Sequence, residues 1–264
     1  LAPYGLIVTS IEYDNPDVFP DEKHLFTVFR KLVKQLRPKG LLVVNTDYPL
    51  AARLIKSAQS RGVRVKPYGV KKLWPHLILT VPGVMNQLNA TAAARLAHEL
   101  GVAQGVIRDA LADFRVVARR FEKKGERDGI LFFDDYAHHP TAIRMTIQAA
   151  REKYPDRRVL VVFEPHTFSR TRALKKEFAD ALAIADLAII TDVYPSREKP
   201  ATPTEASDLS QEVAELANDR VNHVGGPLEQ VAGRVRPLIQ SGDVVFTMGA
   251  GSIYKLHEKL VRDS

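Results

Sequence analysis

The sequence of 264 residues contains no cysteine. That absence excludes disulfides, zinc sites built from thiolates and catalysis by a thiol. No apolar run approaches the roughly 20 residues that a membrane helix needs. No signal peptide opens the chain, because residues 1–4 lead straight into a strand-like run. These absences predict a cytoplasmic protein with no membrane partner.

Charge of one sign is not concentrated anywhere in the chain. The net charge of +7 suggests an anionic partner, but basic residues are interleaved with acids along predicted helices such as 151–158. We therefore expect most of them to lie on solvated faces, and we predict no nucleic-acid binding. A small anionic substrate stays open. The 45% hydrophobic and 26% charged content is typical of a globular protein.

Short β-branched runs alternate with amphipathic stretches, which predicts an α/β fold with helices covering a mainly parallel sheet. Residues 116–128 are highly charged and break the helical pattern, so we expect a linker there, followed by an edge hairpin. This divides the chain into domains at 1–117 and 118–264. In the first domain, strands are expected at 6–11, 40–45, 63–66 and 76–81, and helices at 24–36, 49–60, 86–100 and 103–114.

The alternation is cleaner in the second domain. Strands are expected at 130–133, 159–163, 187–190, 222–224 and 244–248. Helices are expected at 141–153, around Leu174, Phe178 and Leu182, around Leu209, Val213 and Leu216, at 228–239 and at 253–261.

Polar loops follow four of these strands. Ligands of an open parallel sheet bind outside the carboxyl ends of its strands, so these loops should gather at one edge. They are 134–140 (Asp-Asp-Tyr-Ala-His-His-Pro), 164–172 (Glu-Pro-His-Thr-Phe-Ser-Arg-Thr-Arg), 191–198 (Thr-Asp-Val-Tyr-Pro-Ser-Arg-Glu) and 249–252 (Gly-Ala-Gly-Ser). Histidine-bearing and glycine-rich loops at one edge predict a binding crevice.

Two arginines, Arg170 and Arg172, fall in the first turn of a predicted helix, where the helix dipole favours acids. Their placement favours an anion bridging them and the free backbone N–H groups. In the alternative, both side chains extend into solvent.

The acids and histidines of loop 134–140 also have two interpretations. One of Asp134 and Asp135 could bind a ribose hydroxyl or a metal while the other fixes a turn, or both could cap the helix that begins at Pro140. His138 and His139 could orient an anion or bind a metal with Asp135. Adjacent histidines point in different directions, so we expect at most one to face the crevice.

The Gly249-Ala250-Gly251 turn lacks the third glycine of a dinucleotide fingerprint. It indicates either close approach of the backbone to a ligand or a plain tight turn. The sequence also contains no Gly-x-x-x-x-Gly-Lys-Ser/Thr loop for a triphosphate.

Taken together, the loops resemble those of the Mur ligases. The most specific segments are 134–140, 163–171, 192–195 with Glu198, and 249–251; weaker ones are 9–14, Gly83 with Asn86 and Asn89, and 119–121. The resemblance implies a three-domain, ATP-dependent enzyme of peptidoglycan synthesis with Mg²⁺, ending in a Rossmann-like domain after a P-loop-type central domain. Within the family, the loops look most like the branch that joins L-alanine to UDP-N-acetylmuramate through an acyl phosphate. The branch that recycles murein tripeptide is the alternative.

The resemblance also implies site residues. Asn86 and Asn89 would lie beside the adenine, Arg119 or Arg120 would close over the nucleotide, and Asp135 would meet ATP. His138, His166 and Arg170 would serve catalysis, and Ser169, Tyr194 and Gly249 would contact substrate.

The chain departs from the family pattern in three respects. It begins inside the central domain, which suggests a fragment that is inactive alone. Asn15 stands where the family usually has a magnesium-binding histidine, so no metal ligand is assigned, and Met85 replaces the histidine of a Gly-x-His-Asn segment. A degenerate, non-catalytic binding module therefore stays open. So does a metal-dependent phosphoesterase built on Asp134, Asp135, His138 and His139. The sequence does not indicate an oligomeric state.

Overall fold

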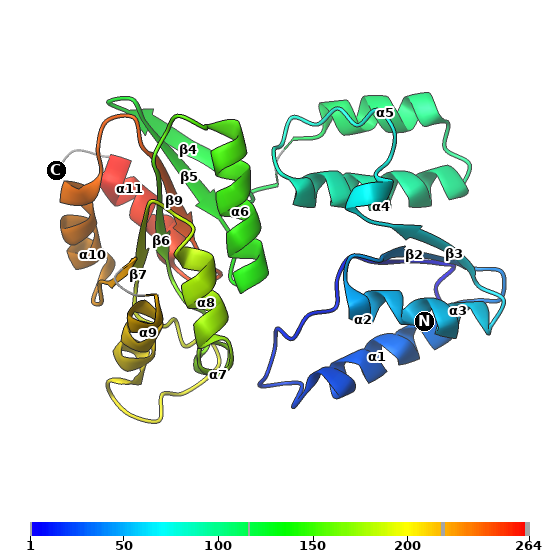
Figure 1. The fold of residues 1–264 in the computed structure, drawn as a ribbon, viewed down its shortest axis with the longest axis horizontal. Helices are drawn as coiled ribbons and strands as arrows, with labels where there is room; N and C mark the ends of the chain where they lie inside the picture. Colours follow the sequence, from blue (N-terminus) through cyan, green and yellow to red (C-terminus); the bar gives the residue numbers. More distant parts are fainter. Residues whose placement is uncertain (1, 116, 218–219, 262–264) are drawn as a thin grey trace. The chain divides into compact units, whose positions relative to one another are not determined.

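The computed structural model describes residues 2–115, 117–217 and 220–261. The chain forms two compact units (Figure 1), unit 1 over Leu1–Arg115 and unit 2 over Val116–Ser264. The division falls between Arg115 and Val116, against 117 and 118 in the sequence-based prediction. The first residue of the predicted linker, residue 116, lies outside the described residues.

Unit 1 is a three-stranded parallel sheet with helices on both faces. Neighbouring residues of the central strand point to opposite faces, as the strand period of two requires. Leu42 packs with the helices α1 and α3, whereas Val43 packs with α4. The elements are β1 (Gly5–Val8), α1 (Glu22–Lys34), β2 (Leu41–Asn45), α2 (Pro49–Ala52), α3 (Leu54–Gln59), β3 (Arg64–Tyr68), η1 (Val70–Lys72), α4 (Val84–Glu99) and α5 (Gln104–Asp113).

Three expectations for unit 1 were wrong in detail. The described residues 76–81 form turns and coil rather than a strand, and His76 has a φ of 55°, outside the β region. The predicted helix 49–60 is interrupted at Arg53, which separates α2 from α3. The predicted helix 86–100 ends at Glu99, and Leu100, which follows it, is 57% exposed.

Unit 2 is a six-stranded sheet in the order β4-β5-β9-β6-β7-β8. Only β4 runs antiparallel, as the expected edge hairpin with β5. Asp128 and Gly129 link the two strands and have φ angles of 52° and 75°. A type I′ turn requires a positive φ at both of its central residues, and Asp-Gly is a sequence that favours this turn. The strands are β4 (Glu122–Arg127), β5 (Ile130–Asp135), β6 (Val159–Phe163), β7 (Leu187–Ile190), β8 (Val221–His223) and β9 (Val244–Met248).

Helices cover both faces of this sheet, so its central strands are buried throughout. In β5, Leu131 and Phe133 pack on the side of α6 and α8, and Ile130 and Phe132 on the side of α10 and α11 (Figure 1). The helical elements are α6 (Pro140–Lys153), α7 (Phe168–Ala173), α8 (Lys175–Leu182), α9 (Glu205–Leu216), α10 (Leu228–Val235), η2 (Arg236–Leu238), η3 (Ile253–Lys255) and α11 (Leu256–Val261). Each falls in an expected helical segment, but the segment expected to begin around Arg170 and Arg172 is divided at Leu174 into α7 and α8.

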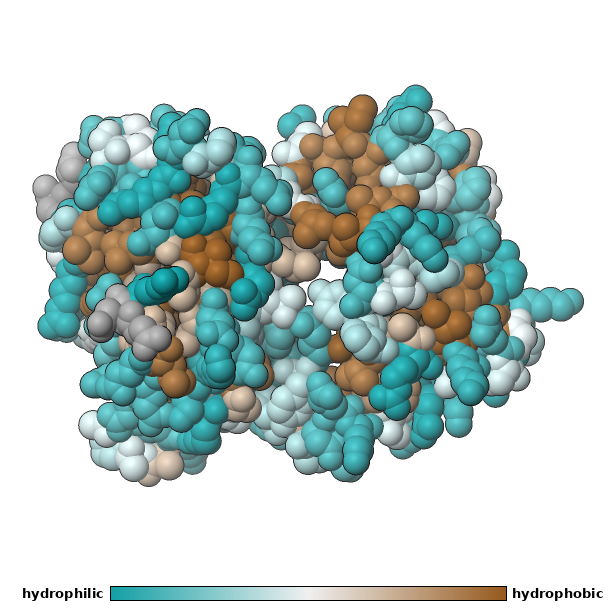
Figure 2. Space-filling view, in the orientation of Figure 1, coloured by the Kyte–Doolittle hydropathy of each residue, from teal (hydrophilic) through white to brown (hydrophobic). Residues whose placement is uncertain are grey.

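The surface in Figure 2 is mainly hydrophilic, with smaller hydrophobic areas between the charged side chains. Among the described residues, no helix is both long enough and apolar enough to cross a membrane.

Candidate functional site

The four predicted loops emerge at the carboxyl edge of the sheet in unit 2. The parallel pairing of β5, β9, β6 and β7 places their carboxyl ends together. The helices that follow β5 and β6 lie on one face, while α11 follows β9 and lies on the other. The connections thus leave the strand ends in opposite directions, which is the arrangement at which α/β sheets bind ligands.

Arg119 joins three of the segments at this edge. Its Nε donates to Asp134 Oδ2 at 2.9 Å and its Nη2 donates to the carbonyl oxygen of Gly249 at 2.7 Å. The guanidinium also lies over the rings of Tyr136 and Tyr254, 5.0 and 4.6 Å from their centroids. Asp134 itself is 1% exposed and accepts a second hydrogen bond from a threonine hydroxyl at 2.8 Å. Arg119 therefore ties the linker to the sheet. The exposed Arg120 is the one of the pair that extends toward solvent.

Asp135 is also turned inward. Its two oxygens accept from the backbone N–H groups of Phe121 at 2.9 Å and Ala137 at 2.8 Å, and Thr146 donates to it at 3.3 Å. Burial raises the pKa of this carboxyl to about 6, although the hydrogen bonds and the Arg120 charge act in the opposite direction. Its contact with ATP stays a prediction. In the described conformation the carboxylate fixes the backbone just before β4, at Phe121, and just after β5, at Ala137.

The two histidines of the loop have different environments. His139 Nδ1 accepts from the Thr141 N–H at 3.3 Å and so caps α6, with Pro140 at the first helical position. The alternative in which Asp134 and Asp135 both cap this helix is wrong, because both end the preceding strand and His139 is the capping residue. His138 instead faces the crevice: its ring centroid lies 6.4 Å from that of His166. His138 Nδ1 lies 2.9 Å from the Tyr136 carbonyl oxygen and donates to it. In the neutral ring, Nε2 then carries the acceptor lone pair.

His166 lies in a corner between α7 and the loop after β7. Its ring stacks on Tyr194 with centroids 5.6 Å apart, and the backbones of the two residues form a parallel bridge. Arg170, only 4% exposed, donates to the His166 carbonyl oxygen at 2.8 Å and lies 3.4 Å from His166 Nδ1. Burial, and then the Arg170 charge, lower the pKa of His166 to about 4. Because Arg170 faces Nδ1 as a donor, the proton of the neutral ring lies on Nε2.

The sequence suggested that Arg170 and Arg172 bind one anion together, but in the structure Arg172 has a different partner. Its Nη2 pairs with Glu205 at the start of α9, which satisfies its charge within the protein.

Ser169, expected to contact substrate, donates from its backbone N–H to Glu198 Oε2 at 2.9 Å and from its hydroxyl to Oε1. Glu198 belongs to one of the segments that most resemble the Mur ligases, but the sequence indicates no separate role for it.

The glycines after β9 are needed for close packing within the chain. A Cβ on Gly249, whose φ is 149°, would lie 2.7 Å from the Glu164 carbonyl oxygen. A Cβ on Gly251 would lie 2.6 Å from Cγ of Tyr194. Glu164 is 6% exposed, accepts from the Ser252 hydroxyl at 3.0 Å, and has its pKa raised by burial. Protein atoms thus approach both glycines closely, and the contact of Gly249 with substrate stays a prediction.

Unit 1 carries the remaining predicted residues. Asn86 lies in the first turn of α4 and donates from Nδ2 to the Pro82 carbonyl oxygen at 2.6 Å, and Asn89, one turn later, is exposed. Met85 lies beside them in the same turn. Asn15 donates to Asp14 at 3.4 Å.

Within the part of the chain that the structure describes, no three histidine or acidic side chains are arranged to hold a metal ion. The phosphoesterase alternative needs such a group and is therefore wrong for these residues.

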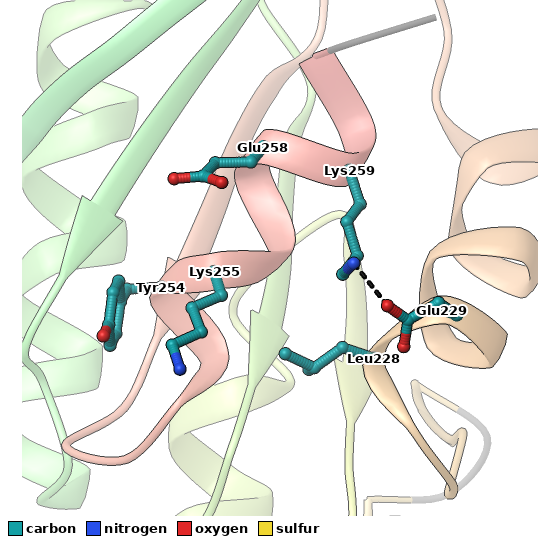
Figure 3. A pocket seen from close by; sticks show the side chains of 6 residues that line it. All are labelled: Leu228, Glu229, Tyr254, Lys255, Glu258 and Lys259. Atoms are coloured by element: carbon teal, nitrogen blue, oxygen red, sulfur yellow. Dashed lines mark hydrogen bonds and ion pairs between the residues drawn. The ribbon is translucent and has the colours of Figure 1, made fainter. Parts of the chain in front are cut away.

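Two hollows lie outside the His166 corner, and the first borders this edge at Tyr254. One, of about 500 Å³, lies between α10 and the 253–261 segment and is lined by Leu228, Glu229, Tyr254, Lys255, Glu258 and Lys259. Lys259 pairs with Glu229 there (Figure 3). The other, of about 650 Å³, lies on unit 1 between α1 and α3. Neither contains a residue expected to act in catalysis.

Comparison with known proteins places these features in a family. The model of the family described as "Mur ligase, glutamate ligase domain" matches residues 119–251. The chain is 34% identical to the UDP-N-acetylmuramate–L-alanine ligase of Salinibacter ruber, over 99% of this chain and 59% of that protein. It is 38% identical to the enzyme of the same name from Kineococcus radiotolerans, over 96% and 58%. The crystal structure of UDP-N-acetylmuramate-alanine ligase MurC from Thermotoga maritima has the same fold, with a TM-score of 0.72 and 24% identity over 98% of this chain and 59% of that one.

The chain thus spans about three fifths of the length of the curated relatives it matches. The family model covers half of its 264 residues, and it includes the four loops of the crevice. The chain belongs to the Mur ligase family.

Proposed function

We propose that this chain is part of an ATP-dependent ligase of peptidoglycan synthesis that joins L-alanine to UDP-N-acetylmuramate through an acyl phosphate. The relatives from Salinibacter ruber and Kineococcus radiotolerans are both named UDP-N-acetylmuramate–L-alanine ligase, and they align over 99% and 96% of this chain. The observation that carries the proposal is the corner formed by His138, His166, Arg170 and Tyr194 at the carboxyl edge of the sheet.

This corner has the hydrogen-bonding groups that amide formation needs. The attacking amine must lose a proton, and the tetrahedral intermediate develops negative charge on oxygen. His138 Nε2 carries an acceptor lone pair and is assigned to the amine. His166 carries its proton on Nε2 and is assigned to the oxyanion. Arg170 is buried behind His166 and supplies a fixed positive charge where the surroundings screen it weakly.

ATP and Mg²⁺ are the proposed cofactors, because forming an acyl phosphate requires a phosphoryl donor and neutralisation of its charge. Asn86, Asn89, Arg120 and Asp135 are the proposed nucleotide contacts in this chain, with Arg119 supporting them. No residue is assigned to Mg²⁺, since Asn15 offers only an amide. A cytoplasmic location, and activity that depends on parts outside these residues, are further proposals.

Phosphate release by the protein of the complete reading frame tests the proposal. Inorganic phosphate should appear only when ATP, UDP-N-acetylmuramate and L-alanine are all present. Release with the murein tripeptide in place of L-alanine would assign the recycling reaction instead. If calorimetry detects ATP binding but no acceptor supports release, the protein is a non-catalytic binding module and the proposal is wrong.

A further inference from the structure

We propose that Glu198 is a positioning residue that holds the His166 and Arg170 corner in its working geometry; this inference rests on the proposed function. Glu198 lies in the loop after β7, and the residues it holds lie in the loop after β6. Nothing in its position along the sequence, 29 residues from Ser169, indicates that the two meet. The contact therefore links two of the four loops that form the crevice.

The start of α7 explains why such a residue is needed. Thr167 occupies the position before the helix, where a threonine normally caps the free N–H groups with its own hydroxyl. Its φ of 71° prevents this, and the helix has no cap from that side chain. Glu198 takes over the capping role from another loop, because its two oxygens accept both the N–H and the hydroxyl of Ser169. A carboxylate is also the group that the N-terminal end of a helix favours.

The consequence reaches Arg170, which lies in the same six-residue helix. Arg170 holds the His166 carbonyl oxygen at 2.8 Å, and Tyr194, from the Glu198 loop, stacks on the His166 ring. The corner is thus closed by three links between the two loops: the backbone bridge, the ring stack and the Glu198 carboxylate. The third link depends on the Glu198 side chain, which can be replaced without changing either His166 or Tyr194.

The decisive variants are Glu198→Ala, which removes both acceptors, and Glu198→Gln, which keeps one oxygen acceptor but no charge. Ser169→Ala removes only the hydroxyl bond. Glu212→Gln is the matched control, since Glu212 is an exposed glutamate of the same unit that pairs with Lys175 and touches none of the loops.

The ¹⁵N shifts of the His166 ring report positioning in this chain without any enzyme assay. The charged groups facing the ring are Arg170, Arg197, Glu198 and, when protonated, His138. Removing the negative charge of Glu198 alone would lower the His166 pKa further, because that charge raises it. Opening of the corner would raise the pKa toward its ordinary value, because water would reach the ring. The two effects have opposite signs, so the direction of change separates positioning from simple electrostatics.

At pH 6 we expect a neutral His166 in the wild type, in Glu198→Gln and in Glu212→Gln. In Glu198→Ala the ring should become substantially charged, approaching about three quarters if its pKa returns to near 6.5. In the complete enzyme, Glu198→Ala should lower kcat/KM for L-alanine by at least about tenfold (about 1.4 kcal/mol) and leave the KM for ATP unchanged. Glu198→Gln should recover part of this loss, and Ser169→Ala should lie between Glu198→Gln and Glu198→Ala.

A neutral His166 in Glu198→Ala, together with kinetics equal to those of Glu212→Gln, would overturn the inference. If Glu198→Ala does not fold, a Ser169→Ala variant with wild-type kinetics and ring shifts would overturn it equally. If the proposed ligase activity is absent but the ring shifts change as expected, the positioning role stands and the proposed function alone fails.

Discussion

Arg119 and Asp134 form an ion pair of 2.9 Å in which the aspartate side chain is 1% exposed and the arginine side chain 22% exposed. The pair lies where the linker enters unit 2, and the same guanidinium reaches the Gly249 carbonyl oxygen in the loop after β9. The chain between the two units is therefore anchored at the crevice rather than at the periphery of the sheet. Arg119 therefore connects the linker to the end of β5 and to the loop after β9.

Replacing Arg119 by alanine should destabilise unit 2 by about 3 kcal/mol, because it leaves a buried carboxylate without its charge partner. Hydrogen exchange of the β5 and β9 amides measures this for unit 2 alone. Arg119→Lys keeps the charge but not the planar fork, and should fall between alanine and wild type. Arg120→Ala is the control, since Arg120 is exposed, and should change the free energy by under about 0.5 kcal/mol. Equal effects of Arg119→Ala and Arg120→Ala would contradict this role.

A second prediction compares two glycines of unit 2. Gly249→Ala should lower the melting temperature, because the new methyl group would lie 2.7 Å from a backbone oxygen at a φ of 149°. Gly233→Ala should raise it, because Gly233 lies within α10 with open space around its Cβ position, and alanine favours a helix by up to about 1 kcal/mol. The same substitution thus has opposite signs at the two sites. A Gly249→Ala protein as stable as the wild type would show that the turn relaxes without loss.

Local sequence patterns predicted most strands of the sheet, but they did not predict which distant side chains meet. The central strands β5, β6, β7 and β9 were predictable from their apolar runs, and the β4–β5 hairpin turn is the kind that the Asp128-Gly129 pair favours. The meeting of four loops at one edge follows from the parallel order alone. The strand predicted at residues 76–81 was wrong. The β-branched residues there alternate as in a strand, but His76 has a left-handed conformation.

The partners of individual side chains could not be predicted in this way. Arg172 meets Glu205, and Ser169 meets Glu198, across 33 and 29 residues of chain. Such pairs depend on how α7, α9 and the loop after β7 pack, which no local pattern encodes. For the same reason the sequence could not show that Asp135 is buried and bound to its own backbone. The predicted site residues of unit 2 lie in the loops at the carboxyl edge of its sheet, but the orientations of their side chains required the structure.

Asp135 should make stability depend on pH. Its pKa is about 6 in the folded chain against a usual value of 3.8, so between these values the folded state holds a proton that the unfolded state lacks. Its contribution is fully present below pH 3.8 and is lost as the pH rises through 6. The free energy of unfolding of the wild type, relative to Asp135→Asn, should therefore increase on going from pH 7 to pH 4, by an amount on the order of 2–3 kcal/mol. A difference that stays flat would mean that the two backbone N–H groups outweigh burial and keep the carboxylate ionised.

His166 should act in the opposite direction over nearly the same range. Its pKa is about 4 in the folded chain against 6.5 for an ordinary histidine, so between these values only the unfolded state holds the proton. Stability from this residue is present above pH 6.5 and is lost as the pH falls toward 4. The wild type should lose stability relative to His166→Gln over that window, measured by hydrogen exchange of the β6 and β7 amides. Because the Asp135 and His166 contributions oppose each other, the wild type alone can show a nearly flat profile, and only the two single variants reveal them. If His166→Gln instead lost stability relative to the wild type as the pH fell, the ring would be charged at neutral pH, and its assignment as a neutral donor to the oxyanion would be wrong.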